Sequence, residues 1–351
     1  MSIMESIINN LLATDKLPYP WVVSIEPVSN ICQLKCPLCP VGAELLTRDR
    51  KFMSLETFKA ILDKMPFVRA IDLYKSGEPF FNPDIFAMIR YAADKKAQVI
   101  ISTNFSFSRA EQFFDDMVNS GLQSLVVSLD GASQETYSKY RVGGDFHLVL
   151  ANIKMLVAAK KRRHSSKPEI TWQFLVNKFN EHEIAQARQI ADELGVPLDL
   201  RPISLADNEP DVVEHPDTIE QRKNHWLPKN EAYISDCYKG EYRYPLSPGI
   251  CTQLFTRMVV TVDGKVLPCC EVWDDSSMFG DLLSESFEGI WYNRKYLEAR
   301  SRFLKKDFQP RSHVVCLRCN NFGAQPSLKD KFNLLTHVYR KCIGHWAKTF
   351  F

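Results

Sequence analysis

Apolar positions in the first 204 residues form short runs that are separated by amphipathic stretches. The apolar runs predict six strands, at 21–26, 69–74, 97–103, 123–129, 170–176 and 196–203. Stretches with a helical period lie between them, near 54–65, 83–95, 109–120, 133–139, 146–161 and 181–194. This alternation predicts an α/β fold whose parallel sheet is covered by helices, either an open Rossmann-type sheet or a partial β/α barrel.

Local signals mark the ends of the last of these helices. Asn180-x-x-Glu183 predicts a capping box where the helix begins, and Gly195 predicts a left-handed residue where it ends. No Gly-x-Gly-x-x-Gly follows the first strand, so we expect no dinucleotide site. In either architecture, we expect functional side chains on the loops that follow the carboxyl ends of the strands.

The alternation of strands and helices stops at about residue 205. Residues 205–250 are rich in Pro, Asp and Glu and predict a linker or lid, while 258–268 predict a hairpin and 286–304 a helix. The basic tail predicts a helix that packs back on the barrel, with docking on a membrane surface or a partner as the alternative. We therefore expect an N-terminal extension (1–20), a barrel (21–204), a linker or lid (205–250), a hairpin-plus-helix domain (251–325) and a C-terminal helix (326–351).

Length and charge narrow the class of protein. The 351 residues suffice for roughly two domains, and 44 Lys and Arg against 42 Asp and Glu give a net charge of +2. This balance provides no overall attraction to nucleic acid. The N-terminus lacks the basic and apolar regions of a secretory signal, and no run of about 18 apolar residues predicts a membrane span. We therefore expect a cytoplasmic protein.

The ten cysteines form an N-terminal cluster and a C-terminal set. Cys32, Cys36 and Cys39 follow the first predicted strand at a C-x3-C-x2-C spacing. Three thiols on one loop can converge on an iron–sulfur cubane, and because a [4Fe–4S] cluster takes four ligands, one iron would stay open for a substrate or cofactor. A zinc knuckle that lacks its fourth ligand is the alternative.

The C-terminal set brackets the predicted hairpin. Four thiolates there can close around a [4Fe–4S] cluster or around zinc, and their spacing alone does not separate the two. The candidate ligands are Cys251, Cys269, Cys316 and Cys319. The remaining Cys237, Cys270 and Cys342 are interpreted as small buried hydrophobic residues, although Cys270 adjoins a ligand and could replace it.

The cysteine loop after the first strand resembles the hallmark of the radical S-adenosylmethionine (radical SAM) superfamily, and the resemblance covers roughly residues 20–325. It implies a partial (β/α)6 barrel, a [4Fe–4S] cluster whose open iron binds SAM, and reductive cleavage of SAM to a 5′-deoxyadenosyl radical. It also implies an external electron donor of the flavodoxin or ferredoxin type. Leu38 and Ser76 stand where the family often has an aromatic residue and a glycine.

Later strand ends also resemble the SAM-binding segments of this family. They imply backbone carbonyls that hold the SAM amino group, polar side chains near its ribose and a cation for its carboxylate. The residues concerned are Gly77, Glu78 and Pro79 after strand two, Asn104 after strand three, Ser128 and Asp130 after strand four, the cation Arg141, and Gln173 on strand five.

The second cysteine set resembles the SPASM/twitch extension of radical SAM enzymes, which favours iron–sulfur over zinc. Residues 320–327 contain no cysteine, so the further ligands of a two-cluster SPASM domain are missing. The resemblance therefore implies a smaller, twitch-type C-terminal domain with one auxiliary [4Fe–4S] cluster. Two clusters are expected in the whole chain.

A cluster with four cysteine ligands has no open iron for a substrate, so electron transfer is its simplest role. The spacing is similar to that of the twitch-type 2-deoxy-scyllo-inosamine dehydrogenases, which implies two-electron oxidation of a small polar metabolite, a sugar or cyclitol alcohol. Arg201, near the end of strand six, is the candidate substrate contact, with a structural ion pair as its alternative.

Two other functions stay open. One is a peptide-modifying maturase, but only about 20 residues precede the first strand, so we expect no separate leader-recognition domain there. The other is a cysteine-rich metal-binding or electron-transfer protein without catalysis.

Overall fold

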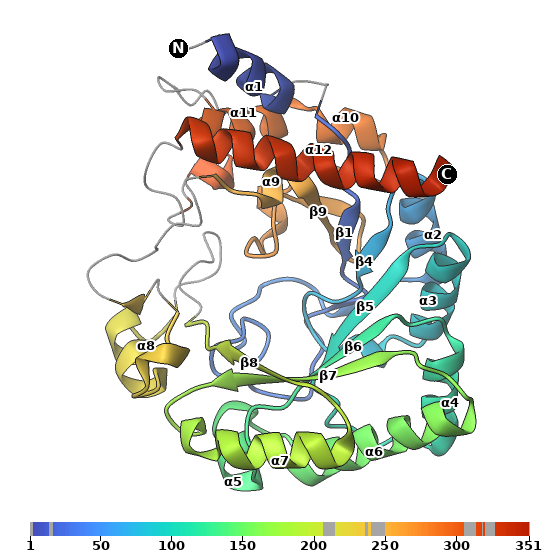
Figure 1. The fold of residues 1–351 in the computed structure, drawn as a ribbon, viewed down its shortest axis with the longest axis vertical. Helices are drawn as coiled ribbons and strands as arrows, with labels where there is room; N and C mark the ends of the chain where they lie inside the picture. Colours follow the sequence, from blue (N-terminus) through green and yellow to red (C-terminus); the bar gives the residue numbers. More distant parts are fainter. Residues whose placement is uncertain are drawn as a thin grey trace.

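The computed structural model describes residues 3–13, 17–205, 215–235, 238–239, 250–304, 314–317, 319 and 327–350. One nine-stranded sheet dominates it, in the order β11-β10-β9-β1-β4-β5-β6-β7-β8 (Figure 1). Six of these strands are parallel and follow chain order, as predicted: β1 (Val22–Ile25), β4 (Ala70–Asp72), β5 (Gln98–Thr103), β6 (Ser124–Ser128), β7 (Glu169–Val176) and β8 (Leu198–Pro202). Among the described residues, β11 and β8 are the edge strands of this sheet.

The six predicted helices are all present and cover the outer side of the curved sheet (Figure 1). They are α2 (Leu55–Asp63), α3 (Ile85–Asp94), α4 (Glu111–Asn119), α5 (Gln134–Tyr140), α6 (Phe146–Arg162) and α7 (Ile184–Leu194). Strand β7 shows how the sheet is sided: Ile170, Trp172, Phe174 and Val176 are buried in the main core, whereas the residues between them are half-buried. Six parallel strands with helices outside confirm the partial barrel.

The ends of α7 confirm one local prediction and correct another. Gly195 ends the helix in the left-handed conformation, with φ 67°. The predicted capping box is wrong, because a short 3-10 helix, η2 (Glu181–Glu183), precedes α7. The Glu183 carboxylate instead accepts hydrogen bonds from the Ala132 amide and the Ser133 hydroxyl, both at 2.7 Å. Glu183 therefore fixes the start of α5 instead of capping its own helix.

The C-terminal part of the chain extends the barrel's sheet. The predicted hairpin forms from β9 (Arg257–Val260) and β10 (Lys265–Leu267), and β11 (Gly280–Asp281) pairs with β10. Strand β9 lies beside β1 and pairs with it in parallel, so the barrel and the hairpin share one sheet (Figure 1). The predicted helix over 286–304 is present as α10 (Phe287–Trp291) and α11 (Arg294–Leu304).

The remaining elements lie around this framework. They are α1 (Ile3–Ala13), the ribbon of β2 (Val28–Ser29) and β3 (Lys51–Phe52), the 3-10 helices η1 (Pro79–Phe81), η3 (Glu231–Tyr233), η5 (Asp275–Ser277) and η6 (Val315–Leu317), α8 (Ile219–Trp226), α9 (Gln253–Thr256) and α12 (Leu328–Phe350). The tail helix α12 packs against α1, and its buried Lys331 donates to the Leu304 carbonyl at the end of α11, at 2.9 Å. Among the described helices, none has the length and apolar character needed to cross a membrane.

Candidate functional site

The first cysteine loop is tightly folded at the carboxyl end of β1. The Cys39 amide donates to the Cys36 carbonyl at 3.1 Å, and the Ala43 amide donates to the Cys39 carbonyl at 2.8 Å. A Cβ atom on Gly42 would lie 2.4 Å from the Cys36 nitrogen, so the backbone passes here without room for a side chain. Cys36 is buried and Cys32 and Cys39 are half-buried, which places three thiols on one compact loop.

Polar hydrogens of neighbouring residues point at two of these sulfur atoms. Burial raises the pKa of the Cys32 thiol to about 12 and that of Cys36 to about 11, and the neighbouring thiols of the loop raise both values further. The Leu34 amide and the Asn104 side-chain amide donate to Cys32 Sγ at 3.4 and 3.6 Å, and Arg141 Nη1 donates to Cys36 Sγ at 3.8 Å. These donors favour the thiolate forms that an iron–sulfur cluster needs, so the donor set fits such a cluster.

Glu78 connects the ends of β4 and β5 through its side chain. It is 1% exposed and accepts from Thr103 Oγ1 at 2.7 Å and from the amides of Asn104 and Phe80 at 2.9 and 3.2 Å. Burial outweighs these hydrogen bonds and raises the pKa of Glu78 to about 7. The Glu78 carboxyl group is therefore occupied within the protein, which leaves the backbone of residues 77–79 as the part that can face a ligand.

Gly77 brings this segment against the cysteine loop. Its φ of 74° lies in the left-handed region, and a Cβ atom there would be 2.4 Å from the Ile31 carbonyl oxygen. The Glu78 amide donates to the same carbonyl at 2.8 Å. Glycine is thus required by both the backbone conformation and the close approach, and Pro79 follows as the first residue of η1.

The sequence reasoning missed Gln33, which lies inside the C-x3-C spacing. Gln33 Nε2 donates to Asn104 Oδ1 at 2.7 Å and to the Ser106 carbonyl at 2.9 Å. It therefore fixes the Asn104 amide that contacts Cys32. Its position between two cysteines that are predicted ligands was the available signal.

Asp130 and Arg141 form a second polar centre beside the loop. Asp130 is fully buried and accepts from Arg141 Nε and from the Leu175 amide, both at 2.6 Å. Burial raises the pKa of Asp130, whereas the Arg141 charge and the hydrogen bonds lower it. Arg141 thus pairs with Asp130 on one side and Cys36 on the other, which holds a cation at the edge of the cysteine site.

The other predicted residues divide into two groups. Ser128 Oγ lies 3.5 Å from Ser102 Oγ, and Ser128 is the register partner of Gln173, so these residues form a polar row across β5, β6 and β7. Arg201 stays apart, on the edge strand β8, where its side chain is 61% exposed and pairs with Asp199 at 2.8 Å.

The segment expected as a linker or lid covers the cysteine loop. Trp226 of α8 and Leu205 belong to one buried cluster with Leu38, Tyr140 and Cys36, and Cys32 and Cys39 pack against this cluster. A His215 ring nitrogen lies 3.2 Å from the Pro37 carbonyl oxygen. Residues far from the loop in sequence therefore contribute to its burial.

The second cysteine set comes together from three segments. Burial raises the pKa of Cys251 to about 11 and raises the pKa values of Cys269 and Cys316 well above their usual range. Neighbouring thiols of the same set raise these values further: Cys319 acts on Cys251 and Cys316, and Cys251 acts on Cys269 and Cys316. Four half-buried thiols within electrostatic range suit an iron–sulfur cluster chemically.

The positions of the other cysteines correct one prediction. Cys270 is exposed, with Sγ 3.4 Å from Glu271 Oε1, so its interpretation as a buried hydrophobic residue is wrong. The side chains of Cys237 and Cys342 lie outside the described residues. In the described part of the chain, no group of three or more His, Cys, Asp or Glu side chains is arranged to hold a single metal ion.

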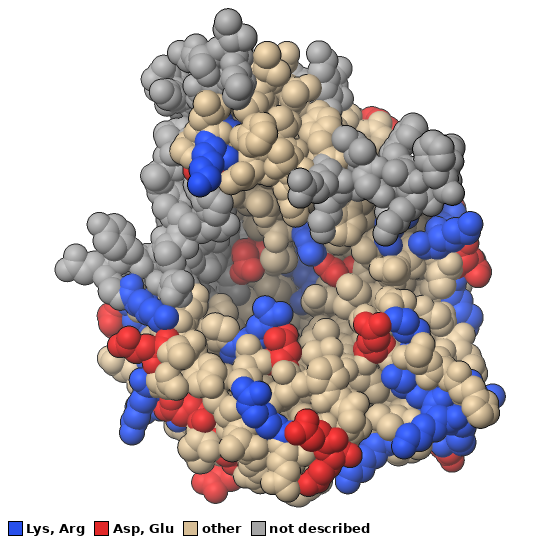
Figure 2. Space-filling model, viewed as in Figure 1, with Lys and Arg blue, Asp and Glu red and all other residues tan. Residues whose placement is uncertain are grey.

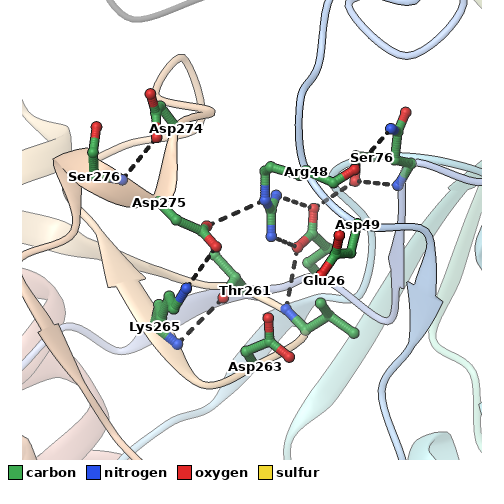
Figure 3. A network of polar contacts seen from close by, with 12 residues as sticks. Glu26, Arg48, Asp49, Ser76, Thr261, Asp263, Lys265, Asp274, Asp275 and Ser276 are labelled. Atoms are coloured by element: carbon green, nitrogen blue, oxygen red, sulfur yellow. Dashed lines mark hydrogen bonds and ion pairs between the residues drawn. The ribbon is translucent and has the colours of Figure 1, made fainter.

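A network of polar side chains, centred on the buried Glu26 and Arg48, joins the two halves of the sheet (Figure 3). Glu26, directly after β1, makes two hydrogen bonds to Arg48, at 2.8 and 2.7 Å, and accepts from the Val262 amide at 3.1 Å. Arg48 Nε also contacts Asp275 at 3.2 Å, and Asp275 pairs with Lys265 at 2.7 Å. The network holds the hairpin region against the cysteine loop.

The face drawn in Figure 2 is hollowed near its centre, with acidic and basic side chains around the hollow.

Comparisons with known proteins agree with this arrangement. Residues 27–184 match the model of the Radical SAM superfamily, and residues 251–320 match that of the SPASM iron-sulfur cluster-binding domain. The AdoMet-dependent heme synthase of Methanosarcina barkeri is 30% identical over 168 residues, 47% of this chain and 45% of that protein. The mycofactocin maturase MftC of Mycobacterium ulcerans is 23% identical over 309 residues, 84% of this chain and 78% of that protein.

A solved structure shares the fold. The crystal structure of BtrN in complex with AdoMet and 2-DOIA covers 88% of this chain and 96% of its own, with a TM-score of 0.51 and 18% identity. At this identity the likeness establishes the fold alone. The chain spans less than half the length of the heme synthases that it matches.

Proposed function

We propose a function from the premise that this chain belongs to the radical SAM superfamily of enzymes and carries a C-terminal SPASM iron–sulfur domain. Its cofactors are iron–sulfur clusters and S-adenosylmethionine. The proposed reaction is two-electron oxidation of a hydroxyl-bearing carbon in a small polar metabolite, a sugar or cyclitol alcohol.

Different residues bind the cluster and the different parts of SAM. Cys32, Cys36 and Cys39 hold the cluster that binds SAM, and the backbone of residues 77–79 meets the SAM amino group. When bound, this cluster and SAM supply a 5′-deoxyadenosyl radical, with the electron coming from an external donor of the flavodoxin or ferredoxin type. Arg141, held by Asp130 at 2.6 Å, provides the cation for the SAM carboxylate. The remaining SAM contacts are Asn104, Ser128 and Gln173.

The polar inner face of the barrel is the observation that carries the choice of substrate. Asp72 accepts from Ser24 Oγ at 3.4 Å and pairs with Arg257 of β9 on the face opposite the main core. The proposed SAM contacts Ser128 and Gln173 lie on the same side of the sheet. A carboxylate accepts hydrogen bonds from hydroxyl groups and a guanidinium donates them, so this face suits a substrate with several hydroxyls.

The proposed oxidation balances over three steps. When bound, SAM would supply the acceptor for one hydrogen atom of the substrate carbinol and would leave as 5′-deoxyadenosine. As the hydroxyl loses one proton, the auxiliary cluster, which Cys251, Cys269, Cys316 and Cys319 would hold, would supply the acceptor for one electron. The product is a ketone, and one 5′-deoxyadenosine forms for each ketone. BtrN, which shares the fold, was solved with AdoMet and 2-DOIA.

Deuterium transfer tests the proposal. The reconstituted full chain is incubated with SAM, a reductant and cyclitol or sugar alcohols deuterated at the carbinol carbon, beginning with 2-deoxy-scyllo-inosamine. We expect deuterium in 5′-deoxyadenosine in a one-to-one ratio with the ketone. The variant without Cys32, Cys36 and Cys39 is the control and should form neither product. Unlabelled 5′-deoxyadenosine with every alcohol of the panel would contradict the proposal.

Peptide modification is the second candidate function. It is favoured by the alignment with the mycofactocin maturase, which extends over 84% of this chain. In the same assay, a deuterated peptide substrate replaces the alcohol. Label that reaches 5′-deoxyadenosine only from the peptide side chain would establish this second function in place of the first.

A further inference from the structure

Lys75 links the barrel directly to the loop of an auxiliary ligand. It follows β4 and is half-buried, and its Nζ donates to the Cys270 carbonyl at 3.1 Å and to the Val272 carbonyl at 2.9 Å. The same ammonium lies 3.6 Å from the centre of the Trp273 ring. All three partners come directly after Cys269, so the positive charge of Lys75 sits against the segment that carries this ligand.

The residues next to Lys75 contact the other cysteine site. Ser76 Oγ lies 3.1 Å from the Val28 carbonyl oxygen and accepts from the Asn30 amide at 3.3 Å. The Glu78 amide donates to the Ile31 carbonyl at 2.8 Å. One short segment, residues 75–78, therefore touches the loop of Cys32 on one side and the loop of Cys269 on the other.

We infer that Lys75 is a positioning residue for the auxiliary iron–sulfur cluster, which holds the Cys269 loop against the barrel and favours the reduced cluster through its positive charge. Reduction adds one negative charge to a cluster, so a cation held nearby stabilises the reduced state. A more easily reduced cluster is a better electron acceptor. The inference depends on ligation by the second cysteine set and is independent of the identity of the substrate.

The chain offers a matched control for the structural part of this role. Lys64, which follows α2, also joins the barrel to the C-terminal region, since its Nζ donates to the carbonyls of Leu282 and Glu285. These partners follow β10 and β11 and lie outside the segment from Cys269 to Trp273. A loss of interdomain hydrogen bonds at Lys64 therefore leaves the charge beside the Cys269 loop in place.

The test measures the midpoint potential of the auxiliary cluster by redox titration with electron paramagnetic resonance. The full chain carries C32A, C36A and C39A, so that the auxiliary cluster alone is read. We compare this background with K75Q, which keeps a hydrogen-bond donor but removes the charge, with K75R, which keeps the charge, and with K64M. Iron content is measured for every variant.

We expect K75Q to lower the equilibrium constant for one-electron reduction about tenfold, equal to 59 mV, as a unit charge near the cluster should. K75R and K64M should stay near the background value. Loss of the cluster from K75Q with retention in K75R also supports the positioning role. Equal potentials in K75Q and the background, or an equal shift in K64M, would overturn it. Absence of an auxiliary cluster from the background chain would overturn both the role of Lys75 and the assignment of the cluster ligands. Failure of the alcohol assay leaves the role of Lys75 unaffected.

Discussion

Replacing Arg48 with methionine should strongly destabilise the protein, because it leaves a buried carboxylate without its cation. The side chains of Arg48 and Glu26 are 6% and 0% exposed, and two parallel hydrogen bonds of 2.8 and 2.7 Å join them (Figure 3). Arg48 also contacts Asp275 at 3.2 Å. The variant R48M removes all these contacts and keeps most of the apolar length of the side chain.

The magnitude follows from what Glu26 retains. Breaking a buried ion pair by removing one partner costs about 3–5 kcal/mol of unfolding free energy. Glu26 keeps the Val262 amide at 3.1 Å and the Ser76 hydroxyl as donors, so we expect the lower end, about 3 kcal/mol. This is roughly a hundredfold shift of the unfolding equilibrium. Because E26L in the same background removes the stranded charge, the double variant should regain much of the loss.

Urea unfolding of the cluster-free proteins, followed by circular dichroism under anaerobic conditions, measures these free energies. The wild-type chain, R48M, E26L and the double variant form a cycle that isolates the interaction between the two side chains. K95M is the matched control, since Lys95 and Asp63 form an ion pair at 2.6 Å whose side chains are 39% and 52% exposed; such a pair is worth about 1 kcal/mol or less. If R48M costs no more than K95M, or if R48M and E26L are additive, the reasoning is wrong.

Three further outcomes are expected. Replacing Cys32, Cys36 and Cys39 together by alanine should abolish 5′-deoxyadenosine formation and leave the absorbance of the auxiliary cluster; persistent SAM cleavage would refute the ligand assignment. The pKa of Glu78, raised by burial to about 7 from its ordinary 4.5, means that the folded state holds a proton that the unfolded chain releases, so stability should fall as pH rises from 4.5 to 7. E78Q should remove this fall in unfolding free energy, which is about 3 kcal/mol in the wild-type chain. Urea unfolding at several pH values measures it, and the same pH profile in E78Q and the wild type would contradict the prediction. R201A should change the unfolding free energy by less than about 1 kcal/mol, because the ion pair of Arg201 with Asp199 is exposed. A raised KM of R201A for the alcohol substrate would support a substrate contact by Arg201, and an unchanged KM would exclude it.

The sequence alone determined the repeating elements of the barrel. The six parallel strands and their helices lie where the apolar pattern predicts them, as in β7, whose buried Ile170, Trp172, Phe174 and Val176 alternate with half-buried residues. Burial on one face repeats every second residue in a strand, so the signal is contained in a few consecutive positions. The proximity of Cys32, Cys36 and Cys39 was also predictable, since the three thiols share one loop.

Contacts between distant segments carried no comparable signal. The hairpin was predicted, but the parallel pairing of β9 with β1 was not, because strand pairing depends on residues more than 200 positions apart, such as Val22 and Arg257. Glu183 matched a capping box, yet its carboxylate is used by the start of α5. A local motif states which hydrogen bonds a residue can make, and the fold selects among them.

The polar links between the two cysteine sites were decided by tertiary structure alone. Glu26, Arg48 and Lys75 have no unusual spacing in the sequence, and their roles arise where β1, β4 and the hairpin region meet. Cys270, beside the proposed ligand Cys269, is exposed although its residue type favours burial. Burying a charge requires a partner, and the partners of these residues come from segments that only the folded chain brings together.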